Sequence, residues 1–246
     1  MKTLVTRYDK KSIGELPIIQ FQGRIIVIQS KEEAKKAVDY LLSQKIIGID
    51  TETKPVFKKG AAMNKVALLQ VSTDDTCFLF RLNYIGFTDD LVRLMSDEKV
   101  IKVGLSLKDD FMQLNRRKTF TAGKYAELQT IVREMGIADQ SLQKLFANFF
   151  RKKISKSQQL SNWETDVLTE SQKIYAATDA WACVKLYEEI QRLESTGYML
   201  DIIPDPNAIS PQQLEAQDLP KSSNSMKDAK KVKRTNTSRK RIKQAI

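Results

Sequence analysis

Short apolar, β-branched runs alternate with segments of helical periodicity along residues 24–193, and this order limits the fold more than any other feature of the sequence. Such runs predict strands, and the polar turn TDDT between 66–72 and 77–82 favours an antiparallel hairpin. Helical segments fill most of the other connections, which is typical of crossovers between parallel strands. The remaining predicted strands are 24–28, 46–50 and 100–105, and the predicted helices are 34–44, 89–97, 108–117, 141–150 and 169–193.

Local signals mark where several of the helices begin and end. Ser30 and Glu33 form a capping box before the first helix, and Thr169 is a suitable N-cap for the longest one. The segment 126–136 is expected to begin extended and to become helical, with Gly136 at its end. One hairpin among helical crossovers predicts an α/β fold, with a mixed sheet and helices on its faces.

The sequence contains no histidine. This excludes Ser-His-Asp and Cys-His catalysis, histidine-ligated zinc and a histidine general base. The two cysteines, Cys77 and Cys183, form no metal or disulfide pattern and are more typical of small buried residues. An enzyme with this composition would have to use carboxylates, lysine, tyrosine or serine.

Positive charge is concentrated near the C-terminus. The formal net charge is +11, of which residues 221–246 carry +9, from ten Lys or Arg and one acidic residue. Four of the six prolines also lie after residue 200, which marks a change of composition. We therefore expect a folded domain over 1–203, with its core at about 20–195, and a basic disordered tail over 204–246.

No apolar run approaches the roughly 20 residues of a membrane span, and the N-terminus lacks the apolar core of a signal peptide. We expect a cytoplasmic protein, or a nuclear one in a eukaryotic source, without a membrane partner. The basic tail is expected to add nonspecific affinity for nucleic acid, to act as a localisation signal or to increase solubility.

Acidic residues follow two of the predicted strands. The apolar run 46–49 leads into Asp50 and Glu52, which share one face because strand side chains alternate. A pair of this kind, taken alone, is more typical of a solvated strand end. Asp109 and Asp110 lie at the next strand-to-helix junction, where the helix dipole favours acidic residues. Only Asp110 shares the apolar stripe of that helix, so it is the candidate for facing inward.

Tyr175 and Asp179 are four residues apart and therefore lie on one face of the longest predicted helix. The alternative is the edge of an amphipathic helix. Small residues around Asp179 would let the helix approach another element closely, and a buried carboxylate needs a partner. No lysine or arginine lies near it in the sequence, and a divalent cation is a natural partner for several converging carboxylates.

Three segments, GIDTET, VGLSLKDDFMQL and YAATDA, resemble in order the three exonuclease motifs of the DEDD superfamily. The resemblance is to its tyrosine branch, which includes ribonuclease D and the Werner syndrome exonuclease domain, and it is strongest to the Werner type. The intervening segments NKVALLQVSTDDTCFLF and LSNWETDVLTESQKIYAATDAW extend it, so that it covers about residues 20–195.

The resemblance implies an RNase H-like fold with a mixed five-stranded sheet flanked by helices. It implies a 3′-5′ exonuclease that uses two divalent cations, Mg²⁺ or Mn²⁺, to release nucleoside 5′-monophosphates from nucleic acid with a free 3′ end, with DNA favoured over RNA. Alternatives are a phosphodiesterase for oligonucleotides or dinucleotides and a catalytically silent nucleic-acid-binding module. The implied metal ligands are Asp50, Glu52, Asp110 and Asp179, and the implied catalytic residues are these four and Tyr175.

Substrate contacts are expected from residues near these motifs. Thr51 lies between the first two acids, and Met63 and Phe57 lie in the polar loop that follows them, where they could contact terminal bases or cover the sheet edge. The basic segment 149–163 could bind phosphates, and Trp163 could stack on a base or serve as a packing residue.

Overall fold

The computed structural model describes residues 1–203 except 59 and 61. The predicted tail over 204–246 lies outside the described residues, so its disorder and the predicted limit of the domain stay predictions. No helix in the described part combines the length and the hydropathy that crossing a bilayer requires.

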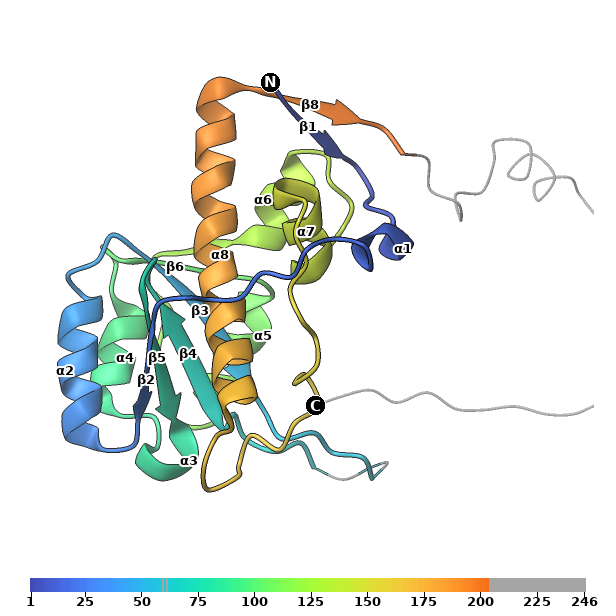
Figure 1. The fold of residues 1–246 in the computed structure, drawn as a ribbon. Helices are drawn as coiled ribbons and strands as arrows, with labels where there is room; N and C mark the ends of the chain where they lie inside the picture. The colour runs from blue at the N-terminus through green and yellow to red at the C-terminus, as the bar shows by residue number, and fades with distance from the viewer. Residues whose placement is uncertain (59, 61, 204–246) are drawn as a thin grey trace, which may run out of the picture. The chain divides into compact units, whose positions relative to one another are not determined.

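A six-stranded mixed sheet forms the centre of the fold, with strand order β2-β5-β4-β3-β6-β7 (Figure 1). The hairpin β4-β5 and the pair β3-β4 are antiparallel, and the other neighbours are parallel. The α/β class is therefore as predicted, but the sheet has six strands rather than five, because the extended start of 126–136 pairs with β6 as a short edge strand. The strands are β2 Arg24–Ile28, β3 Ile46–Glu52, β4 Leu68–Ser72, β5 Thr76–Arg81, β6 Ile101–Gly104 and β7 Tyr125–Glu127.

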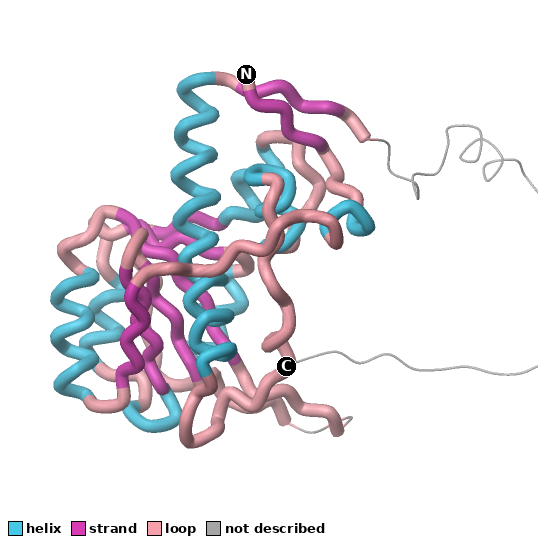
Figure 2. Tube along the Cα trace, viewed as in Figure 1, coloured by secondary structure: helices cyan, strands magenta, loops and turns pink. Residues whose placement is uncertain are grey.

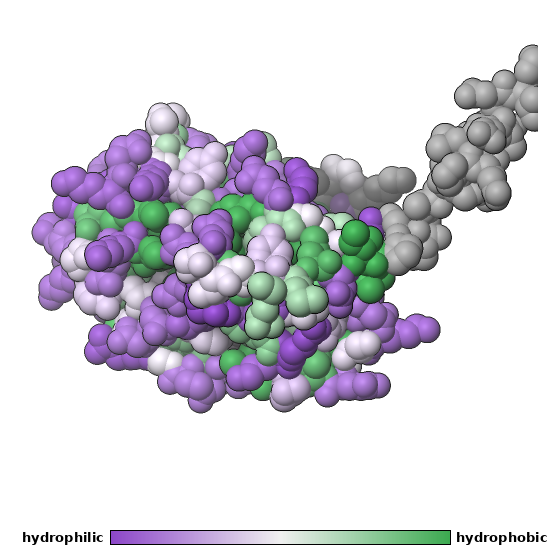
Figure 3. Space-filling view, turned by 90° about the horizontal axis from the view of Figure 1, so that it is seen from above, coloured by the Kyte–Doolittle hydropathy of each residue, from purple (hydrophilic) through white to green (hydrophobic). Residues whose placement is uncertain are grey.

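Helices cover both faces of this sheet (Figure 2). Apolar side chains of α2, α4 and α5 pack on one face, against Ile49 and Val71 among others. The long helix α8 packs on the other face, and α6 and α7 extend that layer. Hydrophilic residues cover most of the face seen in Figure 3, with smaller hydrophobic areas between them. The helices are α2 Lys31–Leu41, α3 Leu82–Ile85, α4 Asp89–Ser96, α5 Leu107–Asn115, α6 Leu128–Glu134, α7 Leu142–Phe150 and α8 Glu170–Thr196.

The predicted helix boundaries are confirmed where the signal is local. Ser30 and Glu33 form the reciprocal capping box of α2. Thr169 caps α8 with a second box, which it completes with Gln172. Gly136 follows α6 with φ of 86°, a conformation that favours glycine.

Regular structure extends beyond the predicted core of 20–195 at both ends. The strand β1 (Lys2–Val5) pairs in parallel with β8 (Tyr198–Asp201), and the short helix α1 (Lys10–Ile13) follows β1. The side chain of Asn148 on α7 holds β1, because it accepts a bond from Val5 N at 3.0 Å and donates to Val5 O at 2.7 Å. The terminal strands are thus joined to the helical layer by specific contacts.

A close approach between α8 and β3 brings the two elements that carry the acidic motifs together. A Cβ atom added at Gly48 would lie 1.9 Å from the carbonyl oxygen of Ala180. Glycine is therefore required at this point of β3, two residues before Asp50. Ala180 directly follows Asp179, so the same contact places Asp179 beside the end of the strand.

Candidate active site

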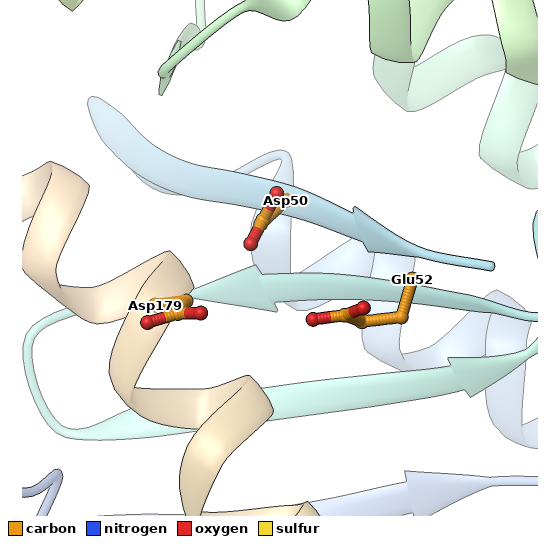
Figure 4. A group of neighbouring side chains, drawn as sticks. All are labelled: Asp50, Glu52 and Asp179. Atoms are coloured by element: carbon orange, nitrogen blue, oxygen red, sulfur yellow. The ribbon is translucent and has the colours of Figure 1, made fainter. Parts of the chain in front are cut away.

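Three carboxylates converge where β3 ends beneath α8. Asp50 and Glu52 point to the same face of the sheet, toward the helix that carries Asp179, and the three are shown together in Figure 4. One oxygen from each lies within 4.8 Å of an oxygen from each of the others. Asp179 is only 8% exposed, so this is not a solvated strand end. The sequence prediction that these acids meet is thus confirmed.

Asp110 lies at the edge of this acidic cluster, which we define as Asp50, Glu52 and Asp179. It stands in the first turn of α5 and accepts a hydrogen bond from the Thr51 hydroxyl, with an Oγ1–Oδ1 distance of 2.5 Å. Asp109 beside it is exposed, whereas Asp110 is half-buried, as the apolar stripe of the helix predicted. Thr51 also donates its backbone N–H to Asp50 at 2.9 Å, and so links the two acids.

Burial raises the pKa values of Asp179 and of the three neighbouring acids, and repulsion by other carboxylates adds to the rise at Asp50, Glu52 and Asp110. Burial, and then the charge of Asp179, raise the pKa of Asp50 to about 8. Burial and the neighbouring carboxylates raise the pKa of Glu52 to about 10. The pKa of Asp179 is raised by burial to about 7, although a hydrogen bond from Tyr175 and the charge of Lys156 oppose the rise. Burial and Asp50 likewise raise the pKa of Asp110 well above its ordinary value.

Tyr175 contacts the cluster through its hydroxyl. It lies one turn before Asp179 on α8 and donates a hydrogen bond to that carboxylate. Burial, followed by the charge of Asp179, raises the pKa of the phenol above its ordinary value, so the hydroxyl keeps its proton at neutral pH. Its ring packs near Trp163, with ring centroids 6.0 Å apart.

A cavity of about 390 Å³ opens over these side chains. Its lining includes Asp50, Glu52, Tyr175 and Asp179. The rest of the lining comes mainly from α6, α7 and the segment 154–159, and it mixes neutral hydrogen-bonding side chains such as Gln129 with apolar ones such as Leu142. Lys156, which is exposed, belongs to that segment and supplies a positive charge at the cavity. The cavity has the size of a small-molecule site.

The donor set fits a hard divalent cation. It consists of carboxylate oxygens, which are the ligands that Mg²⁺ and Mn²⁺ prefer. Every charged side chain that shifts the pKa of Glu52 is itself a carboxylate. Converging like charges of this kind are relieved by a cation, so the cluster is a candidate metal site.

The predicted substrate contacts have different outcomes. Trp163 is completely buried beneath α8 and can offer no ring face to a base, so its prediction as a stacking residue is wrong and the packing interpretation holds. Thr51 lines the cavity, but its hydroxyl is already bonded to Asp110. Met63 and Phe57 are 61% and 81% exposed in the loop after β3, and their contact with substrate stays a prediction.

Sequence reasoning missed Glu127 and included Lys156 only as part of a basic segment. Glu127 is the last residue of β7 and the N-cap of α6. Glutamate is not among the residues favoured at an N-cap, so the local role of Glu127 carried little sequence signal. Its contacts with α5, about 20 residues earlier in the chain, carry no such signal.

Comparison with known proteins agrees with the fold and the geometry. A family model described as 3′-5′ exonuclease matches residues 25–193. The chain is 29% identical over 200 residues to the mouse bifunctional 3′-5′ exonuclease/ATP-dependent helicase WRN, covering 76% of this chain and 14% of that protein. It is 31% identical over 181 residues to the exonuclease 3′-5′ domain-containing protein 2 of Drosophila melanogaster, covering 70% of this chain and 30% of that protein. The chain thus spans less than a third of the length of either relative.

Solved structures share the fold at lower identity. The Aedes aegypti Nibbler EXO domain superposes with a TM-score of 0.66 at 21% identity, covering 74% of this chain and 95% of that one. Escherichia coli RNase D superposes with a TM-score of 0.61 at 17% identity, covering 70% of this chain and 46% of that one. These neighbours identify the sheet and its helices as RNase H-like. With the family model over residues 25–193, they establish that the chain belongs to the 3′-5′ exonuclease family of the DEDD superfamily.

Proposed function

We propose that this protein removes nucleotides one at a time from the 3′ end of nucleic acid, in a hydrolytic reaction that requires divalent cations. The observation that carries the proposal is the convergence of Asp50, Glu52 and Asp179 within 4.8 Å of one another. They line a cavity of about 390 Å³, which can admit a terminal nucleotide. Family membership supports the same reaction.

Two cations, Mg²⁺ or Mn²⁺, would be held by Asp50, Glu52, Asp110 and Asp179 in this proposal. When bound, such a pair of ions activates a water molecule and stabilises the charge on the attacking and leaving oxygens. The four carboxylates supply the negative charge that retains the ions beside a phosphate. Asp110 reaches the cluster through α5, and Thr51 orients it from β3.

Tyr175 acts as a neutral hydrogen-bonding group in this proposal, in agreement with the tyrosine branch that the sequence motifs resemble. Because the phenol keeps its proton, it can orient the attacking water but cannot act as a strong base. Its bond to Asp179 fixes the direction of the hydroxyl toward the cluster. Lys156 also lines the cavity and is a candidate for contact with a substrate phosphate.

DNA is the first substrate to test, because the sequence motifs are most similar to those of the Werner type. RNA is the second, because a structural neighbour is Trypanosoma brucei RNase D in complex with RNA U12, at a TM-score of 0.62 and 17% identity. Discrimination between the two polymers depends on contacts to the 2′-hydroxyl of the sugar.

The direct experiment incubates the protein with 5′-labelled single-stranded DNA, recessed duplex DNA and RNA, each with Mg²⁺ or Mn²⁺. We expect a ladder of products shortened from the 3′ end and no cleavage after chelation. Cleavage of dinucleotides alone would indicate a small-substrate phosphodiesterase. Binding without shortening of any substrate would indicate a silent binding module, and either outcome would overturn the proposal.

The basic tail is proposed to add affinity and not to take part in the chemistry. Residues 221–246 carry +9 of the +11 net charge, and contacts between cationic side chains and phosphates release counterions. Deleting 221–246 should weaken binding at low salt and flatten its salt dependence, with little change in the single-turnover rate at saturation. An unchanged salt dependence would show that the tail does not contact the substrate.

A further inference from the structure

Glu127 receives hydrogen bonds from the first turns of two different helices. Its Oε1 atom accepts the backbone N–H of Ser106 at 3.0 Å and that of Gln129 at 3.1 Å. Its Oε2 atom accepts the backbone N–H of Leu107 at 2.6 Å. Gln129 belongs to α6, which Glu127 caps directly, whereas Ser106 and Leu107 begin α5. A single half-buried carboxylate therefore joins the starts of α5 and α6.

The turn that leads into α5 depends on this carboxylate. Ser106 occupies the N-cap position with φ of 67° and ψ of 33°, a left-handed conformation that non-glycine residues rarely adopt. Its own side chain makes no capping hydrogen bond. The first N–H groups of a helix have no partner within the helix, so an outside acceptor must supply one. At the start of α5 that acceptor is Glu127.

The same turn carries Asp110 to the acidic cluster. Asp110 lies three residues after Leu107, in the first turn of α5, and its carboxylate bonds to the Thr51 hydroxyl. A continuous path of contacts therefore runs from Glu127 through the start of α5 to Asp110, and through Thr51 to Asp50. A shift of this turn would move Asp110 relative to the acids of β3.

We infer that Glu127 is a positioning residue that holds the start of α5 so that Asp110 can join the acidic cluster in binding divalent cations. This inference rests on the proposed function, because it assigns Asp110 to the metal site. Groups that orient metal ligands through hydrogen bonds commonly change metal affinity by roughly 10–100-fold when they are removed. Both carboxylate oxygens of Glu127 already accept backbone N–H groups, which distinguishes its role from that of a metal ligand.

Glu33 offers a matched control, at the start of α2 on the face of the sheet away from the acidic cluster. The Glu33 carboxylate accepts the backbone N–H groups of Gln29 and Ser30, at 3.0 and 3.1 Å, at the start of α2. Like Glu127, it is a glutamate carboxylate that accepts two backbone N–H groups at the start of a helix, although it belongs to that helix. Any effect that comes only from losing a carboxylate cap should be similar in Glu33→Ala and Glu127→Ala.

The test compares Mn²⁺ binding by isothermal titration, without nucleic acid, in the wild-type protein and in the variants Glu127→Ala, Glu127→Gln and Glu33→Ala. We expect Glu127→Ala to weaken Mn²⁺ binding by about 10–100-fold. Glu127→Gln should give a smaller loss, because its amide oxygen can still accept from Ser106 or Gln129. Glu33→Ala should bind Mn²⁺ as the wild-type protein does. Melting temperatures show which variants are folded.

Cleavage measured against Mn²⁺ concentration provides the second readout. High Mn²⁺ should restore much of the rate of the Glu127 variants, because the carboxylates of the site remain present. Wild-type Mn²⁺ affinity in folded Glu127→Gln and Glu127→Ala would overturn the inference, and if the alanine variant does not fold, the glutamine variant alone decides. If the wild-type protein binds no Mn²⁺, the proposed function fails instead, and the two failures are therefore distinguishable.

Discussion

Two buried aspartates in this molecule have opposite surroundings. Asp139, which is 4% exposed, accepts the backbone N–H of Tyr8 at 2.6 Å and the ammonium group of Lys144 at 2.8 Å. Asp179, which is 8% exposed, faces other carboxylates, and its hydrogen-bonding partner is the Tyr175 hydroxyl. Burial is nearly equal at the two sites, but only Asp139 has a cation of the protein bonded to it.

The difference shows that burial of a carboxylate does not by itself indicate function. Around Asp139 the protein supplies the compensating charge, and the residue joins the N-terminal segment to α7. Around Asp179 the charge balance is left incomplete, which costs folding stability unless the acids are protonated or a cation binds. A group whose partner must come from outside the protein is the better candidate for a functional site.

The largest expected effect is loss of activity when Asp179 is replaced. Asp179→Asn should lower turnover by at least about 10³-fold, because a lost metal ligand removes several kcal/mol of transition-state stabilisation. The metal-free variant should melt at the same temperature as the wild type or higher, because one repelling charge is gone. Single-turnover cleavage and thermal melting in the presence of a chelator measure the two effects. A large drop in the melting temperature of the metal-free variant would make Asp179 resemble Asp139 and remove the contrast.

Replacing Tyr175 should have a somewhat smaller effect. Tyr175→Phe keeps the buried ring and removes the hydroxyl, and we expect turnover to fall by roughly 10²–10³-fold, as for the loss of one positioned donor. Mn²⁺ binding should survive because all four carboxylates remain. Titration calorimetry and cleavage between pH 6 and 9 separate these effects. Cleavage at the wild-type rate would reduce Tyr175 to a packing residue.

Stability without metal should depend on pH through the cluster. The raised pKa values of Asp50 and Asp179, about 8 and 7, mean that the folded protein binds more protons than the unfolded chain above pH 4. The free energy of unfolding of the metal-free protein therefore decreases as the pH rises from about 4 to 8. We expect the melting temperature to fall by about 5–10 °C over this range, as for a loss on the order of 2–3 kcal/mol.

Saturating Mg²⁺ should oppose this fall, and should do so more strongly at pH 8 than at pH 5, because the carboxylates must lose their protons to bind it. Asp50→Asn should flatten the dependence in the metal-free protein. If the melting temperature of Asp50→Asn depends on pH as steeply as that of the wild type, the pH dependence does not come from the cluster.

The smallest expected effect concerns Asp139. Asp139→Asn keeps an acceptor for Tyr8 but loses the charge that pairs with Lys144, so we expect a loss of about 1–2 kcal/mol in unfolding free energy. The melting temperature should fall by about 3–6 °C, with turnover and Mn²⁺ affinity unchanged. If Asp139→Asn impairs cleavage as strongly as Asp179→Asn does, the distinction between the two aspartates does not hold.

Local features of this protein could be predicted from the sequence because the residues that interact are close in the chain. The capping boxes of Ser30 with Glu33 and of Thr169 with Gln172 involve partners three residues apart. The shared face of Asp50 and Glu52 and the inward side of Asp110 follow from strand and helix periodicity alone. The meeting of these acids with Asp179 was predicted because three ordered motifs resemble those of a known family.

Tertiary structure decided the features that join distant parts of the chain. The pairing of β1 with β8 links residues 2–5 to 198–201, and short strands of this kind carry little sequence signal of their own. Trp163 had two interpretations until the packing of α8 enclosed its ring. Glu127 was not singled out in the sequence, and only the fold brought the start of α5 within its reach. Periodicity sets the direction of a side chain, but its partner depends on which elements pack together.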